Sequence, residues 1–350
     1  MVKYGIIGCG SAFAQNHLEP MKQIAGLHIA ALADTDAGRL DELSKSLGVR
    51  DVYTDYREML ARAGIDAVLI ALPPTLNRDA AAQAARAGRH ILLEKPIATT
   101  LEAARDVIDT CAAHRVKLCI GHQRRYAATE RRAKEILAAG RLGRLFRVKV
   151  RHTTDCVSWL NGQAGWRTDA AVAGGGIWLL WGVHYTDLLR WLTGAEAVSV
   201  FARVRNVACP DIATEDDAFA LVEMTEGILG EVEVSAARRA VEPAAHGPVG
   251  EMVEIYGSEG TLVWSRTEGV LRLATKHGTD VITVPGGRED WGDAERRLHE
   301  AFVDCIERDL EPPVTGDDGL RALEIVLAGY RSSDEGCAVP LRTPGVGGGS

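Results

Sequence analysis

The amino-terminal stretch Val2-Lys3-Tyr4-Gly5-Ile6-Ile7-Gly8-Cys9-Gly10-Ser11-Ala12-Phe13 decides the fold. Its apolar residues predict a buried strand that ends at Gly8, and the glycines predict a tight turn into a helix. Gly8 permits the turn, while Gly10 lets the backbone approach a pyrophosphate on the helix N-terminus. The alternative is a plain strand-to-helix turn. We expect the following residues to contact a dinucleotide: Gly8, Gly10, Ser11, Ala12 and Phe13, the last of which stands where Gly or Ala is usual.

Short apolar runs alternate with helical patterns through the first third of the chain. Nearly continuous apolar strands are typical of a parallel sheet that is covered on both faces. The alternation therefore predicts an α/β fold, a Rossmann domain with a doubly wound parallel sheet, over residues 1–121. The predicted strands are 4–8, 27–33, 67–72, 90–93 and 117–120, and the predicted helices include 37–47, 77–87 and 101–113.

The pattern changes after residue 121, where strands with alternating polarity become frequent. This pattern predicts a C-terminal α+β domain over residues 122–335, with an open and mostly antiparallel sheet. An uncovered sheet favours association, so we expect a homo-dimer or homo-tetramer. Residues 336–350 are Gly-rich and predict a flexible tail. The predicted strands are 144–153, 198–204, 217–224, 230–235, 252–256, 261–264, 270–273 and 281–284, and the predicted helices are 130–139, 293–307 and 318–332.

Composition excludes several classes of protein. The net charge of -8 argues against a nucleic-acid partner, because phosphate binding needs clustered Lys and Arg. The sequence contains no run of 18 apolar residues and no signal-peptide pattern, so neither a membrane span nor secretion is expected. The seven cysteines form no CxxC pair, which favours reduced thiols in the cytoplasm over disulfides or a metal site.

Asp34 ends the second predicted strand, 26 positions beyond Gly8. A carboxylate at that edge can accept both ribose hydroxyls of the adenosine and would repel a 2′-phosphate. The next residues, Thr35 and Asp36, supply no adjacent Arg to hold such a phosphate. We therefore expect NAD as the cofactor, with NADP the less favoured alternative. A second role for Asp34 is that of a helix N-cap.

The sequence Glu94-Lys95-Pro96 directly follows the predicted strand at residues 90–93. In open α/β sheets, ligands bind at the carboxyl ends of the strands. Lys95 would therefore lie beside a nicotinamide, where its ammonium could polarise a substrate hydroxyl or exchange its proton. The alternative is an ordinary solvated lysine.

The chain resembles the glucose–fructose oxidoreductase and inositol dehydrogenase family (Gfo/Idh/MocA) over nearly its whole length. The first strand and turn, Gly5 to Gly10, resemble the opening of that family. The segment Ala87-Gly88-Arg89-His90-Ile91-Leu92-Leu93-Glu94-Lys95-Pro96 resembles its central signature. Further similar motifs occur in the family's order: Gly165-Trp166-Arg167, Gly174-Gly175-Gly176, Gly182-Val183-His184-Tyr185-Thr186-Asp187 and Pro313-Val314-Thr315-Gly316-Asp317-Asp318-Gly319.

The resemblance implies a Rossmann domain followed by a domain with an open sheet. It implies hydride transfer between NAD(P) and a sugar, a cyclitol or a derivative of either. It places Lys95 and His184 at the reacting hydroxyl as catalytic residues. Together with Asp34 and the glycine turn, the expected cofactor contacts are Leu72, Pro73, Pro74, Asn77, Glu94, Lys95 and Gln123.

One departure from the family concerns the position four residues before His184. The family usually has an Asp there, one helical turn away from the His, but this chain has Leu180. The triple glycine and the Gly-Val-His motif on either side fix the alignment. Proton transfer is therefore expected to rest on Lys95 and His184, whose imidazole titrates near neutrality. On its own, a His on an apolar helix is more often a packed core residue.

Four tryptophans, at positions 159, 166, 178 and 181, lie within 23 residues. Tryptophans usually belong to a core, but the flat C–H faces of sugars also pack on indoles. Structural ion pairing is the alternative for Arg125 and Arg167. The expected substrate contacts are Lys95, Arg125, Tyr126, Trp166, Arg167, Trp178, Trp181 and His184, and Gln123 is a further polar candidate.

These features predict an NAD(P)-dependent dehydrogenase that acts on a CH–OH group of a sugar, cyclitol or glycoside. One alternative is a glycoside-cleaving enzyme that keeps its NAD, oxidises transiently and eliminates the aglycone. Such an enzyme would accumulate no NADH. Another alternative is a non-catalytic NAD-binding sensor, against which Lys95 and His184 argue.

Overall fold

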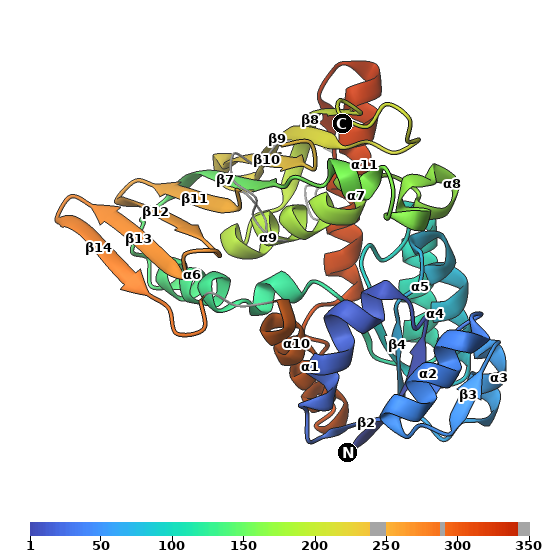
Figure 1. The fold of residues 1–350 in the computed structure, drawn as a ribbon. Coiled ribbons are helices and arrows are strands. Elements are labelled where there is room, and N and C mark those ends of the chain that lie inside the picture. Colours follow the sequence, from blue (N-terminus) through green and yellow to red (C-terminus); the bar gives the residue numbers. More distant parts are fainter. Residues whose placement is uncertain (239–249, 288–290, 342–350) are drawn as a thin grey trace. The chain divides into compact units, whose positions relative to one another are not determined.

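The computed structural model describes residues 1–238, 250–287 and 291–341 (Figure 1). The chain divides into two compact units. The first unit contains residues 1–126 and a later segment, from helix α10 (Trp291–Glu307) to Leu320. The second unit contains the remainder of the chain.

The division therefore differs from the predicted single boundary at residue 121. The reason is that α10, which follows eight of the nine strands of the second unit's sheet in the chain, returns to the first unit. Leu298 and Phe302 on this helix are fully buried, and the helix packs against β1 (Val2–Ile7) and α1 (Leu18–Lys22) of the first unit.

The first unit is built on a six-stranded parallel sheet with the order β3-β2-β1-β4-β5-β6. The direction of winding reverses between β1 and β4, so the carboxyl ends of these two strands border the crevice where doubly wound sheets bind ligands. All four residues of β4 are fully buried, as the apolar runs predicted. The strands after β1 are β2 (Leu27–Ala33), β3 (Asp51–Tyr53), β4 (Ala67–Ile70), β5 (His90–Leu93) and β6 (Leu118–Ile120).

Every strand and helix predicted for this unit is present, with ends within two residues of the prediction. Strand β3 was not predicted, because its residues Asp51, Val52 and Tyr53 are exposed or half-buried and form no apolar run. The prediction also omitted α3. The helical segments of this unit are η1 (Phe13–His17), α1, α2 (Ala37–Leu47), α3 (Tyr56–Arg62), η2 (Pro74–Leu76), α4 (Asn77–Arg86), α5 (Leu101–Ala113), η3 (Gln123–Tyr126) and α10.

The second unit is built on a nine-stranded sheet with the order β14-β13-β12-β11-β7-β10-β9-β8-β15. Strands β7 and β10 are parallel and all other neighbours are antiparallel, which confirms the predicted open and mostly antiparallel sheet. The strands are β7 (Leu145–Thr153), β8 (Ala197–Arg205), β9 (Asp217–Met224), β10 (Leu229–Ser235), β11 (Met252–Gly257), β12 (Gly260–Ser265), β13 (Val270–Thr275), β14 (Gly278–Thr283) and β15 (Val339–Pro340).

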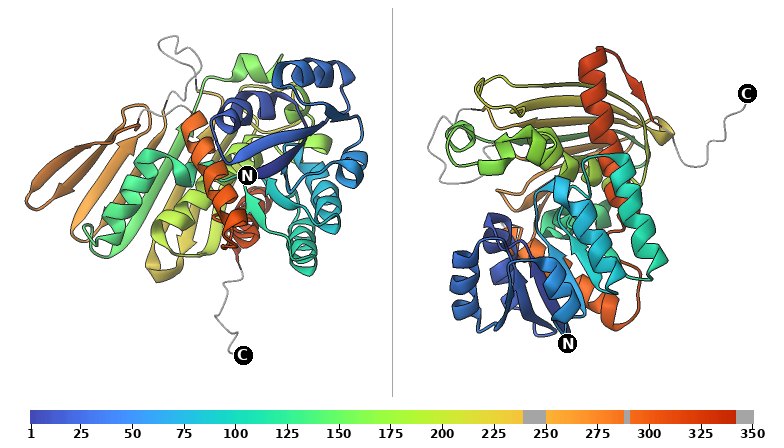
Figure 2. Two further views of the ribbon diagram at one scale, coloured as in Figure 1. Left: turned by 90° about the horizontal axis from the view of Figure 1, so that it is seen from below. Right: turned by 90° about the vertical axis from the view of Figure 1, so that its right-hand side faces the viewer.

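Alternating polarity gives this sheet one buried face. Val150, Val232 and Val253 are buried and lie in register across β7, β10 and β11. Helix α9 packs against β7 and β10, and α6 packs against α9 and β13, as Figures 1 and 2 also show. The helical segments of this unit are α6 (Ala128–Ala138), α7 (Val157–Leu160), η4 (Gly165–Thr168), α8 (Ala170–Ala173), η5 (Trp178–Gly182), α9 (Val183–Thr193), η6 (Thr225–Gly227) and most of α11 (Gly316–Glu335).

The predicted flexible tail begins too early. Val339 and Pro340 form β15, which pairs with Val200 and Ser199 of β8. Val339 is buried, so its apolar side chain explains why this short segment joins the sheet. Residues 342–350 lie outside the described residues. In the described part of the chain, no helix is both long and apolar enough to cross a membrane.

Candidate active site

The turn after β1 depends on the absence of a side chain at Gly8. The backbone of Gly8 has φ +89°, and a Cβ there would lie 2.6 Å from the carbonyl oxygen of Ala71, just after β4. The N–H of Gly8 donates to the carbonyl of Ala33, the last residue of β2. A Cβ added at Gly10 would meet no atom within 4 Å. Gly8 is therefore required by the fold, whereas Gly10 leaves open space on the side where a pyrophosphate would lie.

Phe13 shows how the chain accommodates a large residue at the third position of the turn motif. Residues Phe13–His17 form a wide π-helical turn before α1, and the Phe13 side chain is fully buried. Its ring packs in the interior, so only the Phe13 backbone is available to a cofactor. Ser11 is exposed and Ala12 is half-buried, as direct contact with a ligand requires.

Asp34 lies at the carboxyl end of β2, and its side chain accepts hydrogen bonds from two backbone N–H groups. Its carboxylate accepts the N–H of Cys9 at 2.7 Å and the N–H of Asp36 at 2.9 Å. The N-cap of α2 is Asp36, which accepts the N–H of Arg39, so the helix-cap alternative for Asp34 is wrong. The first turn of α2 also brings the Arg39 guanidinium to 3.3 Å from Asp34. This Arg was not predicted, because it lies five positions after Asp34 in the sequence and is not adjacent to it.

Leu72, Pro73 and Pro74 follow β4, and the first two are half-buried. Asn77 begins α4 and is fully buried. Its amide nitrogen lies 3.3 Å from the carbonyl oxygen of Glu94 and donates to that of Pro96 at 2.9 Å. The Asn77 amide nitrogen therefore braces the segment around Lys95, and the expected cofactor contact of Asn77 stays a prediction.

The Glu94 carboxylate is turned into the interior of the first unit. It lies 2.9 Å from Nε2 of His17, and its other oxygen accepts the backbone N–H of Lys95 at 3.1 Å. Burial opposes its ionisation, but His17 outweighs burial and lowers the pKa of Glu94 below its ordinary value. Lys95 itself is half-buried. The signature segment is thus held by two side chains, from Asn77 and Glu94.

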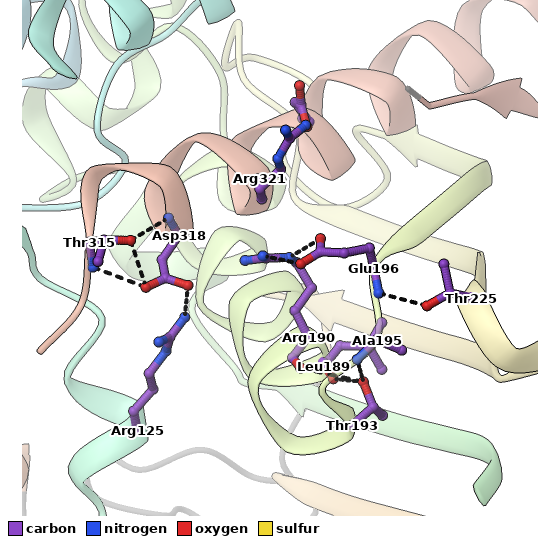
Figure 3. A network of polar contacts seen from close by, with 11 residues as sticks. Arg125, Leu189, Arg190, Thr193, Ala195, Glu196, Thr225, Thr315, Asp318 and Arg321 are labelled. Carbon is purple, nitrogen blue, oxygen red and sulfur yellow. Dashed lines mark hydrogen bonds and ion pairs between the residues drawn. The ribbon is translucent and has the colours of Figure 1, made fainter. Parts of the chain in front are cut away.

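Arg125 has a structural partner. Its guanidinium lies 2.9 Å from Asp318, which also accepts the hydroxyl and backbone N–H of Thr315 (Figure 3). Burial raises the pKa of Asp318, but Arg125 and Thr315 outweigh it and lower the pKa to about 2. This ion pair is the alternative that the sequence left open for Arg125. Gln123 is buried, and the backbone carbonyl of Tyr126 accepts from Arg297.

In the second unit, the triple glycine packs against Glu215, a residue that was not predicted to belong to the site. A Cβ at Gly176 would lie 2.3 Å from the carbonyl oxygen of Glu215, and one at Gly175 would lie 2.3 Å from the Tyr330 hydroxyl. The Glu215 carboxylate accepts the N–H groups of Gly176 and Trp178 and the Tyr330 hydroxyl. Burial raises the pKa of Glu215 above its ordinary value. Glu215 therefore anchors the start of the segment that leads to His184.

His184 is buried on α9, and Leu180 is buried in the preceding π-helical turn η5. Trp178 starts that turn and is fully buried. Its indole N–H donates to the carbonyl of Val326, and its ring closely approaches Gly182. This indole is therefore an enclosed core residue, and its expected substrate contact stays a prediction.

Trp159, Trp166 and Trp181, the other three tryptophans of this segment, are half-exposed and form an aromatic group. Trp159 and Trp181 stack with ring centroids 6.4 Å apart and an interplanar angle of 21°. The Arg167 guanidinium lies 4.5 Å from the centre of the Trp166 ring and 5.8 Å from that of Trp159. His152, which was not predicted to belong to the site, meets Trp181 edge-on, with ring centroids 5.6 Å apart. The structure thus brings Trp166, Arg167 and Trp181 together and adds Trp159.

Two family models match the chain. One describes an oxidoreductase family with an NAD-binding Rossmann fold and matches residues 2–122. The other describes the GFO/IDH/MocA C-terminal domain and matches residues 131–263.

The chain belongs to the GFO/IDH/MocA oxidoreductase family.

Individual relatives are similar over nearly the whole chain. D-apiose dehydrogenase of Paraburkholderia graminis is 29% identical, over 97% of this chain and 90% of its own. The NAD+-dependent scyllo-inositol 2-dehydrogenase of Bacillus subtilis is 27% identical, over 97% and 96%. An Agrobacterium radiobacter oxidoreductase solved with NAD+, L-tartaric acid and magnesium is 25% identical, with a TM-score of 0.84 over 97% and 98%.

The residues of this GFO/IDH/MocA protein fit the cofactor of the family. Gly10 leaves the space that a pyrophosphate needs, and Asp34 presents a carboxylate at the carboxyl end of β2, where the ribose lies in Rossmann domains. Side-chain burial, which no sequence motif encodes, decides the remaining roles. It places the side chains of Asn77 and Trp178 in the interior and reveals Glu215 and His17 as buried partners of the signature segments.

Proposed function

We propose that this chain is an NAD-dependent dehydrogenase that transfers a hydride between a ring carbon of a sugar, cyclitol or glycoside and nicotinamide. The observation that carries the proposal is the placement of Lys95. It directly follows the carboxyl end of β5, and Asn77 and Glu94 brace the segment to which it belongs. The D-apiose and scyllo-inositol dehydrogenases support this substrate class.

We assign the hydroxyl proton to Lys95 and His184. Bound NAD supplies the hydride acceptor. The Lys95 amine takes the hydroxyl proton as the C–H hydrogen leaves with its electron pair, and returns that proton in the reverse direction. The His184 imidazole orients the hydroxyl and shares its proton. Leu180 offers no group that could exchange a proton, so the two remaining residues carry this work.

We further propose that the aromatic group of the second unit, consisting of Trp159, Trp166, Trp181 and Arg167, binds the substrate ring. Indoles that are partly exposed can cover the C–H face of a ring, while a guanidinium bonds to its hydroxyls. The stacking of Trp159 on Trp181 and of Arg167 on Trp166 supports this assignment, because it holds each group in one orientation.

Asp34 should favour NAD over NADP. Its carboxylate binds two backbone N–H groups, which orient it, and its side chain is only 10% exposed. A 2′-phosphate brought to this position would meet that negative charge at close range. Arg39 partly offsets the charge, because its guanidinium lies 3.3 Å away. Its own contacts with Asp34 and Asp36 reduce its capacity to bind a phosphate.

The test is a panel of sugars, cyclitols and glycosides incubated with NAD+ or NADP+, with absorbance of the reduced nicotinamide as the readout. We expect at least one compound to yield NADH, and to do so faster with NAD+ than with NADP+ at equal ionic strength. Faster turnover with NADP+ would overturn the assignment of Asp34. Release of an aglycone without net NADH would replace the dehydrogenase with the glycoside-cleaving alternative.

We place the enzyme in the cytoplasm. None of the seven cysteines, all of which lie in the described residues, forms a disulfide, and five of them are buried. Free thiols in this number are typical of proteins that fold under reducing conditions.

The large sheet supports self-association. Phe201 and Phe219 are exposed on neighbouring strands β8 and β9, and Phe146 is exposed on β7. We expect a homo-dimer or homo-tetramer in which this face is covered. Phe219→Glu should shift the protein toward monomer in light scattering at micromolar concentration, while Leu310→Glu, at an exposed position of the first unit, serves as the control. A monomeric wild-type protein would contradict this assignment.

A further inference from the structure

A group of four titratable side chains lies buried in the first unit next to Lys95. We call it the His17 cluster, and it consists of His17, Glu94, Glu295 and His299. His17 ends the turn after β1, Glu94 follows β5, and Glu295 and His299 lie one turn apart on α10. Three of them are at most 1% exposed, and Glu94 is 9% exposed. The reaction assigned above uses none of these side chains directly.

The ring of His17 occupies the centre of the cluster. Its Nε2 lies 2.9 Å from a carboxylate oxygen of Glu94. Its Nδ1 lies 3.0 Å from Nε2 of His299 and 3.1 Å from a carboxylate oxygen of Glu295. Both ring nitrogens therefore have acceptors when the imidazole carries two protons.

The electrostatics of the cluster favour that doubly protonated ring. Burial lowers the pKa of His17, but Glu295 and Glu94 outweigh burial and raise the pKa to about 10. Burial and the His17 charge both lower the pKa of His299, which keeps it neutral as an acceptor. Burial raises the pKa of Glu295, and His17 opposes this rise.

We propose that His17 is a positioning residue, which holds the Glu94 carboxylate against the backbone N–H of Lys95 and balances its charge. This proposal rests on the proposed function only where it treats Lys95 as the group that exchanges the substrate proton. The contacts that carry it join His17 to Glu94, and Glu94 to the backbone of Lys95.

The charge of His17 matters because Glu94 is adjacent to Lys95. A buried carboxylate without a cationic partner would stabilise the Lys95 ammonium and make its proton harder to remove. With His17 charged, the pair is close to neutral and Lys95 can lose its proton at a lower pH. Besides its own members, the titratable groups that face the cluster are Tyr4 on β1, whose ring meets that of His299 edge-on with centroids 6.1 Å apart, and Lys95, whose charge lowers the pKa of Glu94 and Glu295.

The kinetic test uses His17→Gln, which keeps a donor for Glu94 but removes the charge. We expect the acidic limb of the kcat/KM profile to move upward by roughly one pH unit, so activity below that limb falls about tenfold. Activity at higher pH should recover toward the wild-type value. His90→Gln is the matched control, because His90 lies at the opposite end of β5, where it bonds to the backbone of Lys117. An equal loss of kcat at every pH in His17→Gln would overturn the proposal.

A second measurement is independent of activity. Lysines dimethylated with 13C give NMR signals that report each titration, and the Lys95 signal is the one missing in Lys95→Arg. We expect its titration midpoint to rise in His17→Gln and not in His90→Gln. If the midpoint rises while the kinetic profile stays unchanged, the catalytic role of Lys95 fails and the positioning role stands. If the midpoint does not move, the positioning role fails.

A third measurement uses the wild-type protein and therefore does not depend on whether a variant folds. In 15N NMR of the imidazoles at neutral pH, His17 should be doubly protonated and His299 neutral. A neutral His17 would overturn the proposal. One nitrogen or oxygen atom from each of His17, Glu295 and His299 lies within 4.8 Å of the other two, so a bound cation is the competing explanation for this cluster. A stoichiometric metal in the purified protein, lost in Glu295→Gln, would also overturn it.

Discussion

Lys95→Ala should lower kcat by about two orders of magnitude or more, because a general base contributes typically about 10²–10⁴-fold. With Leu at position 180, the sequence offers no carboxylate one turn before His184 to compensate for the loss. Lys95→Met should leave NAD affinity nearly unchanged, since the turn at Gly8 and Gly10 and the carboxylate of Asp34 make the expected contacts with the rest of the cofactor. Steady-state kinetics on a confirmed substrate, with NAD binding by calorimetry, check both expectations.

His184→Ala separates the two assigned roles. His184→Ala should lower kcat by a smaller factor than Lys95→Ala if the imidazole only orients the hydroxyl. It should lower kcat by a similar factor if the imidazole is the base. Arg190→Lys is a suitable comparison, because it alters an ion pair with Glu196 on the helix that carries His184 and spares both residues. Near wild-type kcat in both Lys95→Ala and His184→Ala would show that the chemistry lies elsewhere in the protein.

Gly8→Ala should act mainly on the stability of the fold, and Gly10→Ala mainly on cofactor binding. At Gly8 the backbone has φ +89°, and the added methyl group would lie 2.6 Å from the carbonyl oxygen of Ala71. We expect this change to lower the free energy of unfolding by about 2 kcal/mol or more. At Gly10 the added methyl group meets no atom of the chain within 4 Å, so stability should change by about 0.5 kcal/mol or less.

NAD affinity should respond more directly to Gly10→Ala than to Gly8→Ala. Gly10→Ala should weaken NAD binding by about tenfold or more while the protein stays folded, because the methyl group occupies the space of the pyrophosphate. Gly8→Ala should weaken it only together with a loss of stability. Chemical denaturation and calorimetry measure the two quantities separately. Wild-type NAD affinity in Gly10→Ala would show that the cofactor does not approach this turn.

Local sequence patterns were sufficient for most of the fold. Apolar runs bounded by glycines located every strand of the first unit except β3, whose three residues carry too little hydrophobic signal. Alternating polarity located eight strands of the second sheet, because one of its faces is buried and the other is not. The return of α10 to the first unit was not predictable in this way. An amphipathic helix shows in its sequence that it needs a partner, but not which surface provides one.

The sequence by itself determined the family, because several short motifs occur in the family's order. It also determined which residues follow the carboxyl ends of the strands, and so proposed Asp34, Lys95 and the turn at Gly8 as site residues. These features depend on neighbours in the chain, and such neighbours can be read directly from the order of the residues.

Only the tertiary structure decided what the polar and aromatic side chains of the site contact. The side chains of Trp178 and Asn77 are buried in the interior, although their positions in the motifs suggested ligand contacts. His17 meets His299 across 282 positions of sequence. The free energy of such a buried polar group depends on whether distant residues supply its hydrogen bonds and balance its charge. Short-range sequence patterns contain no record of those partners, so these roles appear only when the folded chain brings them together.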